Sequence, residues 1–148
     1  MFKRPPRTAY NVMIDLLSRR NHSERELRRK LKEKDFSTED IQAALDKAHE
    51  LKWLETPDNL SVQFADQLHR KNKGIHFINS TLAEKGLPPI ERDEALELDK
   101  ARKLVKTKYS DFSRYSRSEL AKVGRFLASR GFDLSIVRKV IFNHEEEL

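Results

Sequence analysis

The chain has 148 residues, of which 37% are hydrophobic and 36% are charged, and it contains no cysteine. This composition excludes a disulfide framework and a thiolate metal site. No segment approaches the roughly 20 consecutive apolar residues of a transmembrane helix, and no apolar leader is visible, so we expect a cytoplasmic protein. The formal net charge of +6 and the pI of about 9.6 indicate an acidic partner.

The charges are distributed unevenly along the sequence. Residues 1–35 hold 11 Lys or Arg against 5 Asp or Glu, and residues 100–139 hold 12 against 3. Residues 36–69 are acidic, with 2 against 7. Two basic ends could both meet an acidic partner, but such blocks are also typical of solvated helix faces.

Apolar residues recur at spacings of three and four along nearly the whole chain, as they do in amphipathic helices. The stripes comprise, in chain order, Ala9, Met13, Leu16 and Leu17; Leu27 and Leu31; Ile41, Ala44, Leu45, Ala48 and Leu51; Leu60, Phe64 and Leu68; Ile75, Ile78 and Leu82; Leu98, Ala101, Leu104 and Val105; and Ile136, Val137, Val140 and Ile141. No useful length of sequence alternates with a period of two. We therefore predict an all-α fold.

Two motifs predict where helices begin. Ser23 is followed three residues later by Glu26, and Ser116 is followed three residues later by Glu119. In such a capping box the serine oxygen accepts a backbone N–H of the first turn, and the glutamate accepts the N–H of the serine.

Three similar segments predict where helices end: Leu31–Phe36, Leu82–Leu87 and Leu127–Phe132. Each has leucine, two variable residues, a cation, then Asp or Gly, then a large apolar residue. The cation suits the negative end of the helix dipole, and Asp35, Gly86 or Gly131 tolerates a left-handed turn.

These segments repeat after 51 and 45 residues, a period typical of helical repeats. We predict three tandem three-helix modules, at residues 1–54, 55–98 and 99–148, that form an elongated, curved array. The periodicity is nearly unbroken from Asp93 to Tyr109, so the last two modules could share one long helix.

Catalytic motifs are missing from the sequence. It has no Gly-rich phosphate loop and no cysteine nucleophile, and none of its five histidines (His22, His49, His69, His76 and His144) forms the i, i+4 pair of a helical zinc site. We interpret His22, which precedes a helix cap, as a structural residue, and the carboxylates as partners in surface i, i+4 pairs. We therefore expect neither an enzyme nor a cofactor or metal.

The aromatic residues do not alternate with cations as on a platform for single-stranded nucleic acid. We predict that Phe36, Phe64, Phe126 and Phe132 lie in the core. Trp53 is expected to pack at the joint between the first two modules, and Tyr115 is expected to be exposed.

Several cations are candidates for contact with a partner. Arg25, Arg28, Arg29 and Lys32 share one face of the second predicted helix, opposite Leu27 and Leu31. A solvated face is the alternative, although few acidic residues lie within a turn. Further candidates are Arg70, Lys71 and Lys73 in the second module and Arg125, Arg130, Arg138 and Lys139 in the third.

The sequence resembles the RecX family. Residues 16–31 contain the paired leucines, the Arg-x-His-Ser run and the Glu-Leu-Arg-x-Lys-Leu run of the family signature. Later segments that resemble the family are Trp53-Leu54, Phe64-Ala65, Gly74 with Ile78 and Leu82, Lys85-Gly86-Leu87, Lys108-Tyr109 and residues 126–132. The resemblance therefore spans nearly the whole chain.

The middle module departs most from the family pattern. Asn72-Lys73-Gly74 stands where the family usually has Gly-Tyr-Gly, and Phe77 and Asn79 stand where arginine is common. These changes reduce the positive charge of this module. We therefore expect this module to contribute least to contact with a partner.

The resemblance implies a monomeric, non-enzymatic protein of DNA repair and recombination. It implies that the chain binds the RecA recombinase, and especially the RecA filament on single-stranded DNA, and restrains filament growth, ATP hydrolysis and strand exchange. Two alternatives stay open: the same cations could bind DNA directly, or the protein could be a helical scaffold for another acidic partner.

Overall fold

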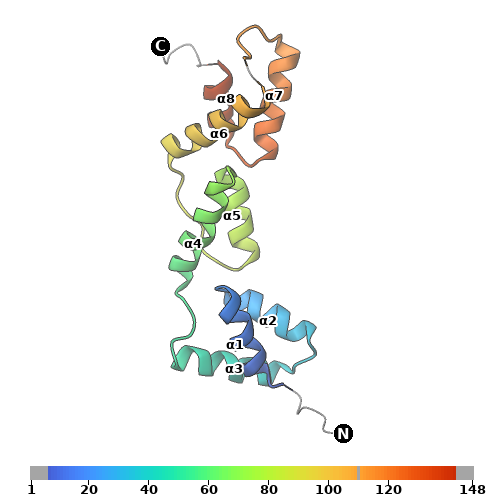
Figure 1. Ribbon diagram of the computed structural model, residues 1–148, viewed down its shortest axis with the longest axis vertical. Helices are drawn as coiled ribbons and strands as arrows, with labels where there is room; N and C mark the ends of the chain where they lie inside the picture. The colour runs from blue at the N-terminus through green and yellow to red at the C-terminus, as the bar shows by residue number, and fades with distance from the viewer. Residues whose placement is uncertain (1–6, 110, 143–148) are drawn as a thin grey trace. The chain divides into compact units, whose positions relative to one another are not determined.

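The computed structural model describes residues 7–109 and 111–142 (Figure 1). This part of the chain forms eight α-helices and no strand: α1 (Ala9–Arg19), α2 (Glu24–Glu33), α3 (Thr38–Glu50), α4 (Pro57–Arg70), α5 (Ile75–Glu84), α6 (Glu94–Lys108), α7 (Arg117–Ser129) and α8 (Leu134–Phe142). The prediction of an all-α fold is confirmed.

The chain divides into two compact units. The first comprises residues 1–61 and 84–88, and the second comprises residues 62–83 and 89–148. In the first unit, α1, α2 and α3 pack together (Figure 1), around the buried side chains of Met13, Leu27, Leu31 and Leu45. These residues belong to the apolar stripes that the sequence shows, so burial of those stripes holds the three helices together.

In the second unit, α6, α7 and α8 surround a core of their own. Val105, Val123, Leu127 and Ile136 are almost completely buried there. An aromatic cluster extends this core, in which the Tyr109 and Phe126 rings meet edge to face with 5.9 Å between centroids.

Both predicted capping boxes form. The Ser23 Oγ accepts the N–H of Glu26 at 3.2 Å, and the Glu26 carboxylate accepts the N–H of Ser23 at 3.1 Å. Ser116 and Glu119 make the same pair of hydrogen bonds at the start of α7. The two serines thereby fix where α2 and α7 begin.

The three predicted helix ends adopt the expected left-handed turn. The φ angle is 65° at Asp35, 71° at Gly86 and 94° at Gly131. After the first and third of these turns, the next N–H bonds back to a leucine carbonyl of the last helical turn, from Phe36 to Leu31 and from Phe132 to Leu127, at 3.3 Å in both cases. All three repeated segments therefore form a left-handed turn, and the first and third also share the same closing hydrogen bond.

One predicted module boundary lies near a loop of the structure, and the other lies within a helix. Residues 51–56 separate α3 from α4, near the boundary predicted at residue 54. The boundary predicted between residues 98 and 99 falls inside α6, in the segment where the sequence allowed a shared helix. The three-module division and its curvature stay predictions.

Two aromatic residues differ in exposure from what the sequence suggested, and the expectation for Tyr115 was wrong. Trp53 is 54% exposed. It follows the left-handed Lys52 at the end of α3, and the next residue, Leu54, packs on the first core. Tyr115 is partly buried, because its ring contacts those of Tyr109 and Phe112 beside the second core.

Candidate functional site

The basic face of α2, formed by Arg25, Arg28, Arg29 and Lys32, is the strongest candidate site. Leu27 and Leu31 are completely buried on the opposite side of the helix. The four cations line one open hollow of about 390 Å³ together with Thr38 and Ile41 of α3. The structure thus brings together the four residues that helical periodicity placed on one face.

The cations of this face differ in the contacts that they make within the protein. Arg28 donates to the Gln42 side chain at 2.8 Å, and the Arg25 side chain packs against Gly86. The Arg29 guanidinium lies 3.9 Å from the Glu33 carboxylate, and both side chains are largely exposed. Such an exposed pair is weak, so Arg29 and Lys32 can turn toward carboxylate or phosphate oxygens of a partner.

A buried carboxylate, Glu26, supports the start of α2 behind this face. Its side chain is only 4% exposed and lies 2.7 Å from Arg20 and 2.9 Å from Lys85. Burial alone would raise the pKa of Glu26, but hydrogen bonds from Arg20, the Ser23 N–H and Lys85 outweigh burial and lower this pKa to about 2. The carboxylate is therefore charged. It ties α2 to the left-handed turn at Lys85-Gly86 that ends α5 (the Gly86 corner).

His22 is a structural residue, as the sequence suggested. Its Nδ1 lies 3.0 Å from the carbonyl oxygen of Arg20 and its Nε2 lies 3.0 Å from the Lys30 ammonium. Burial lowers the pKa of His22, and the nearby positive charges act in the same direction. A neutral imidazole that donates through Nδ1 and accepts from Lys30 satisfies both contacts.

The other predicted contact residues lie in the second unit, where several are engaged locally. Lys73 and Arg130 lie over the Phe77 and Phe126 rings, at 4.7 Å and 5.2 Å from the ring centroids. Lys139 pairs with Glu94. The remaining predicted cations of this unit, Arg70, Lys71, Arg125 and Arg138, are exposed. These cations lie at the end of α4, in the turn that follows it, and on or just after α7 and α8, whereas the four cations of α2 share one helix face.

Sequence analysis missed a buried ionic cluster in the second unit. Lys100 and Glu97 are 2% and 1% exposed and lie 2.5 Å apart. Lys100 also reaches the His69 Nδ1 at 2.8 Å and the Lys73 carbonyl at 2.6 Å, and Glu97 accepts the N–H of Ile75 at 2.9 Å. The cluster joins the end of α4, the start of α5 and α6, and its arrangement is structural.

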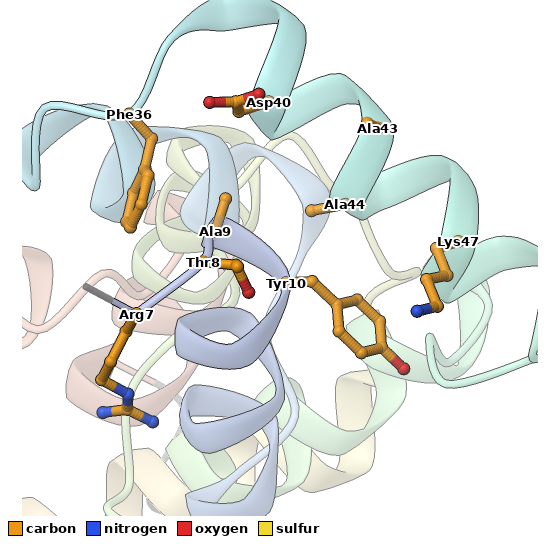
Figure 2. A pocket seen from close by; sticks show the side chains of 9 residues that line it. All are labelled: Arg7, Thr8, Ala9, Tyr10, Phe36, Asp40, Ala43, Ala44 and Lys47. Atoms are coloured by element: carbon orange, nitrogen blue, oxygen red, sulfur yellow. The ribbon is translucent and has the colours of Figure 1, made fainter. Parts of the chain in front are cut away.

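A second hollow in the first unit lies between α1 and α3 (Figure 2). It measures about 370 Å³, and the Tyr10 ring stands within it with the Lys47 ammonium 4.2 Å from the ring centroid. Figure 2 shows Arg7 and Asp40 at separate edges of this hollow. The lining offers no paired acid and base close to a nucleophile, so it does not suggest a reaction.

The described part of the chain contains neither a cluster of metal-ligating side chains nor a membrane-spanning helix. Among residues 7–109 and 111–142, no three His, Asp or Glu side chains are grouped so that they could hold a metal ion. None of the described helices combines the length and the apolar character needed to cross a membrane.

Comparisons with known proteins then decide the family. The model for the first three-helix domain of RecX matches residues 9–47, and the model for the third three-helix domain matches residues 95–141. The regulatory protein RecX of Haemophilus influenzae strain 86-028NP is 32% identical over 132 residues, which cover 84% of this chain and 86% of the relative. The chain belongs to the RecX family.

A second relative supports this membership, and a solved structure supports the fold. RecX of Legionella pneumophila strain Corby is 32% identical over 138 residues, which cover 89% of this chain and 91% of that protein. The crystal structure of RecX from Lactobacillus salivarius matches with a TM-score of 0.76 at 21% identity, over 93% of this chain and 95% of that chain. The matched RecX domains coincide with α1–α3 and α6–α8, so the helical-repeat fold is confirmed.

Proposed function

We propose that this protein is a cytoplasmic regulator that binds the RecA recombinase and its filament on single-stranded DNA, as a monomer and without catalysis of its own. Binding lowers ATP hydrolysis and recombination by RecA. The observation that carries the proposal is the similarity, over most of the chain, to proteins named regulatory protein RecX.

The basic face of α2 supplies the physical means of binding. Its arginines present planar donor pairs that suit carboxylates and phosphates, and they surround a hollow with an apolar side chain, Ile41, at its edge. A filament of recombinase on DNA offers acidic groups of both kinds, so electrostatic attraction would guide the encounter and the hollow would hold one acidic group of the partner.

The decisive experiment adds the purified protein to RecA and single-stranded DNA and follows ATP hydrolysis. We expect hydrolysis to fall as the protein approaches stoichiometric amounts. An unchanged rate at stoichiometric excess contradicts the proposal.

A charge-reversal pair tests the face itself. Arg29→Glu with Lys32→Glu removes two exposed cations, and we expect the concentration needed for half-inhibition to rise about tenfold, since exposed charge contacts contribute about 1 kcal/mol or less each. The matched control is Lys103→Glu with Lys106→Glu, which makes the same change of charge on exposed positions of α6. Equal effects of the two pairs would mean that net charge, and not this face, governs binding.

Direct binding to DNA is the competing function, and salt separates it from the proposal. Affinity for bare DNA falls steeply as salt rises because binding releases counterions. If the protein binds bare DNA tightly and the addition of RecA changes nothing, it is a DNA-binding protein and the proposal fails.

A further inference from the structure

A groove between α7 and α8 is separate from the basic face of α2. It measures about 460 Å³ and is lined by Leu120, Ala121 and Gly124 of α7 and by Ile141 and Phe142 of α8, with Arg117 at one end. Gly124 has no side chain to fill the floor of the groove, and an added β-carbon would already lie 3.3 Å from the Ile141 Cδ1. The lining is almost entirely apolar.

Two large apolar side chains of α8 are exposed, and one of them, Phe142, lines this groove. Phe142 is 66% exposed and Leu134 is 59% exposed. The two residues are eight positions apart on α8, with Arg138 midway between them, so the three share one helix face. Exposed apolar side chains of this size, on a helix that forms one wall of an apolar groove, are typical of a surface that a partner covers.

Cations lie on both helices that form the groove. Arg117 and Arg125 are exposed on α7, and Arg138 is exposed on α8. No carboxylate among the described residues lies within ion-pair distance of these three guanidinium groups. A complementary partner therefore carries apolar side chains flanked by carboxylates.

We propose that the groove between α7 and α8 binds an amphipathic helix of a protein partner, with apolar side chains in the groove and Asp or Glu against Arg117, Arg125 and Arg138. A helix is the fitting occupant because the described chain has no strand edge to which an extended peptide could add. Residues 117, 120, 121 and 124 follow the i, i+3, i+4, i+7 pattern, so the groove runs along α7 as a helix-binding groove does. The inference goes beyond the proposed function, since it requires no recombinase.

The probe is a synthetic helical peptide with leucines at i, i+4 and i+7 and glutamates on both flanks of that stripe. Titrated into the full-length ¹⁵N-labelled protein, it should shift the amide signals of Ala121, Gly124 and Phe142 in a saturable way. A peptide with glutamine at the glutamate positions should bind at least fivefold more weakly, because the three arginines then lose their ionic partners.

Variants of the protein locate the site. Ala121→Trp fills the groove from an exposed helical position and should abolish the saturable shifts, and Arg117→Glu should weaken binding at least fivefold. Lys122→Glu is the matched control, because Lys122 is exposed on α7 but points away from the groove, and it should bind as the unchanged protein does.

Four outcomes would overturn the proposal. The first is the absence of saturable shifts, and the second is equal loss of binding in Lys122→Glu and Arg117→Glu. The third is a dimer in sedimentation that Ala121→Trp converts to a monomer, because a second copy then covers the groove. The fourth is binding that appears only when residues 143–148 are removed, because the chain's own end is then the occupant.

Discussion

Each unit contains a corner, a left-handed turn at a glycine that ends a helix, and the two corners contact their neighbouring helices differently. In the first unit the Gly86 corner lies against the start of α2, and in the second unit the Gly131 corner lies against the start of α5. At Gly86 an added β-carbon would lie 2.8 Å from the flexible end of the Arg25 side chain. At Gly131 it would lie 2.5 Å from the backbone nitrogen and the β-carbon of Phe77.

The hydrogen bonds show the same contrast. The Gly86 corner is tied to α2 by side chains, through the ion pair of Lys85 with Glu26. The Gly131 corner is tied to α5 by backbone, since the N–H of Gly74 bonds to the Arg130 carbonyl and that of His76 bonds to the Gly131 carbonyl, both at 2.9 Å. A side-chain contact can adjust to a substitution and a backbone contact cannot, so we expect the second corner to be far less tolerant.

The carboxylates that support the two helix starts also differ in origin. Glu26 lies within the helix that it caps, whereas the start of α5 is capped by Glu97 from α6, which Lys100 neutralises. The largest effect should therefore follow from Lys100→Met, which leaves Glu97 buried without a counterion and should lower the free energy of unfolding by about 3 to 5 kcal/mol. Urea unfolding followed by far-UV circular dichroism measures this loss.

The double variant Lys100→Met with Glu97→Gln is the control for that change. Glutamine keeps an oxygen for the N–H of Ile75 but carries no charge, so the double variant should be more stable than Lys100→Met alone. A double variant that is no more stable would mean that packing of the lysine chain, and not the buried charge, is what the cluster contributes.

Next in size is Gly74→Ala. A β-carbon at position 74 would lie 2.3 Å from the carbonyl carbon of Gly131 and 2.4 Å from the nitrogen of Phe132, so two backbone segments must separate. We expect a loss of about 2 to 4 kcal/mol in the free energy of unfolding. Gly124→Ala is the control: its β-carbon meets only side-chain ends, those of Ile141 at 3.3 Å and Val137 at 3.6 Å, and it gains helix propensity, so its stability should stay equal or rise.

Local sequence determines much of this fold, and that part could be predicted. The capping serines and the corners at Asp35, Gly86 and Gly131 form as expected, because each depends on residues within one or two turns. The face shared by the α2 cations was predictable for the same reason, because helical spacing alone determines it. Its role in binding stays a prediction.

The burial of Glu97 and Lys100 could not be predicted in this way. A Glu and a Lys three residues apart are typical of a solvated helix surface, and only the packing of α4 and α5 against α6 removes them from water. One signal was present: Glu97 lies four residues before Ala101, and Lys100 four before Leu104, so the pair continues the apolar stripe of α6. The exposure of Tyr115 was mispredicted for a related reason, because tertiary neighbours decide which aromatic ring is covered.

A smaller effect, and one that depends on pH, should follow from Glu26→Gln. The pKa of Glu26 in the folded protein is about 2, below its ordinary value of 4.5. The charged carboxylate therefore stabilises the fold above pH 4.5, and this contribution is lost as the pH falls from 4.5 towards 2. The variant should lose about 2 kcal/mol at pH 7 through its weakened hydrogen bonds with Arg20 and Lys85.

Trp53 is the only tryptophan and lies in the first unit, so its fluorescence during urea unfolding reports on Glu26→Gln. The difference between the two proteins should be constant from pH 7 to about 5 and should shrink below 4.5. A difference that stays the same down to pH 3 would show that the charge of Glu26 does not stabilise the start of α2.

The smallest effect should come from Gly86→Asn, and it tests the contrast between the two corners most directly. Asp35 adopts the same left-handed turn with a φ of 65°, and Asn tolerates that region nearly as well as Gly, so the backbone costs at most about 1 kcal/mol. The Arg25 side chain can move aside. The identical substitution Gly131→Asn should cost about 3 kcal/mol or more, because its β-carbon meets the Phe77 backbone, which has no room to move. Equal losses in free energy of unfolding would mean that left-handed strain, and not the nature of the opposing surface, limits both corners.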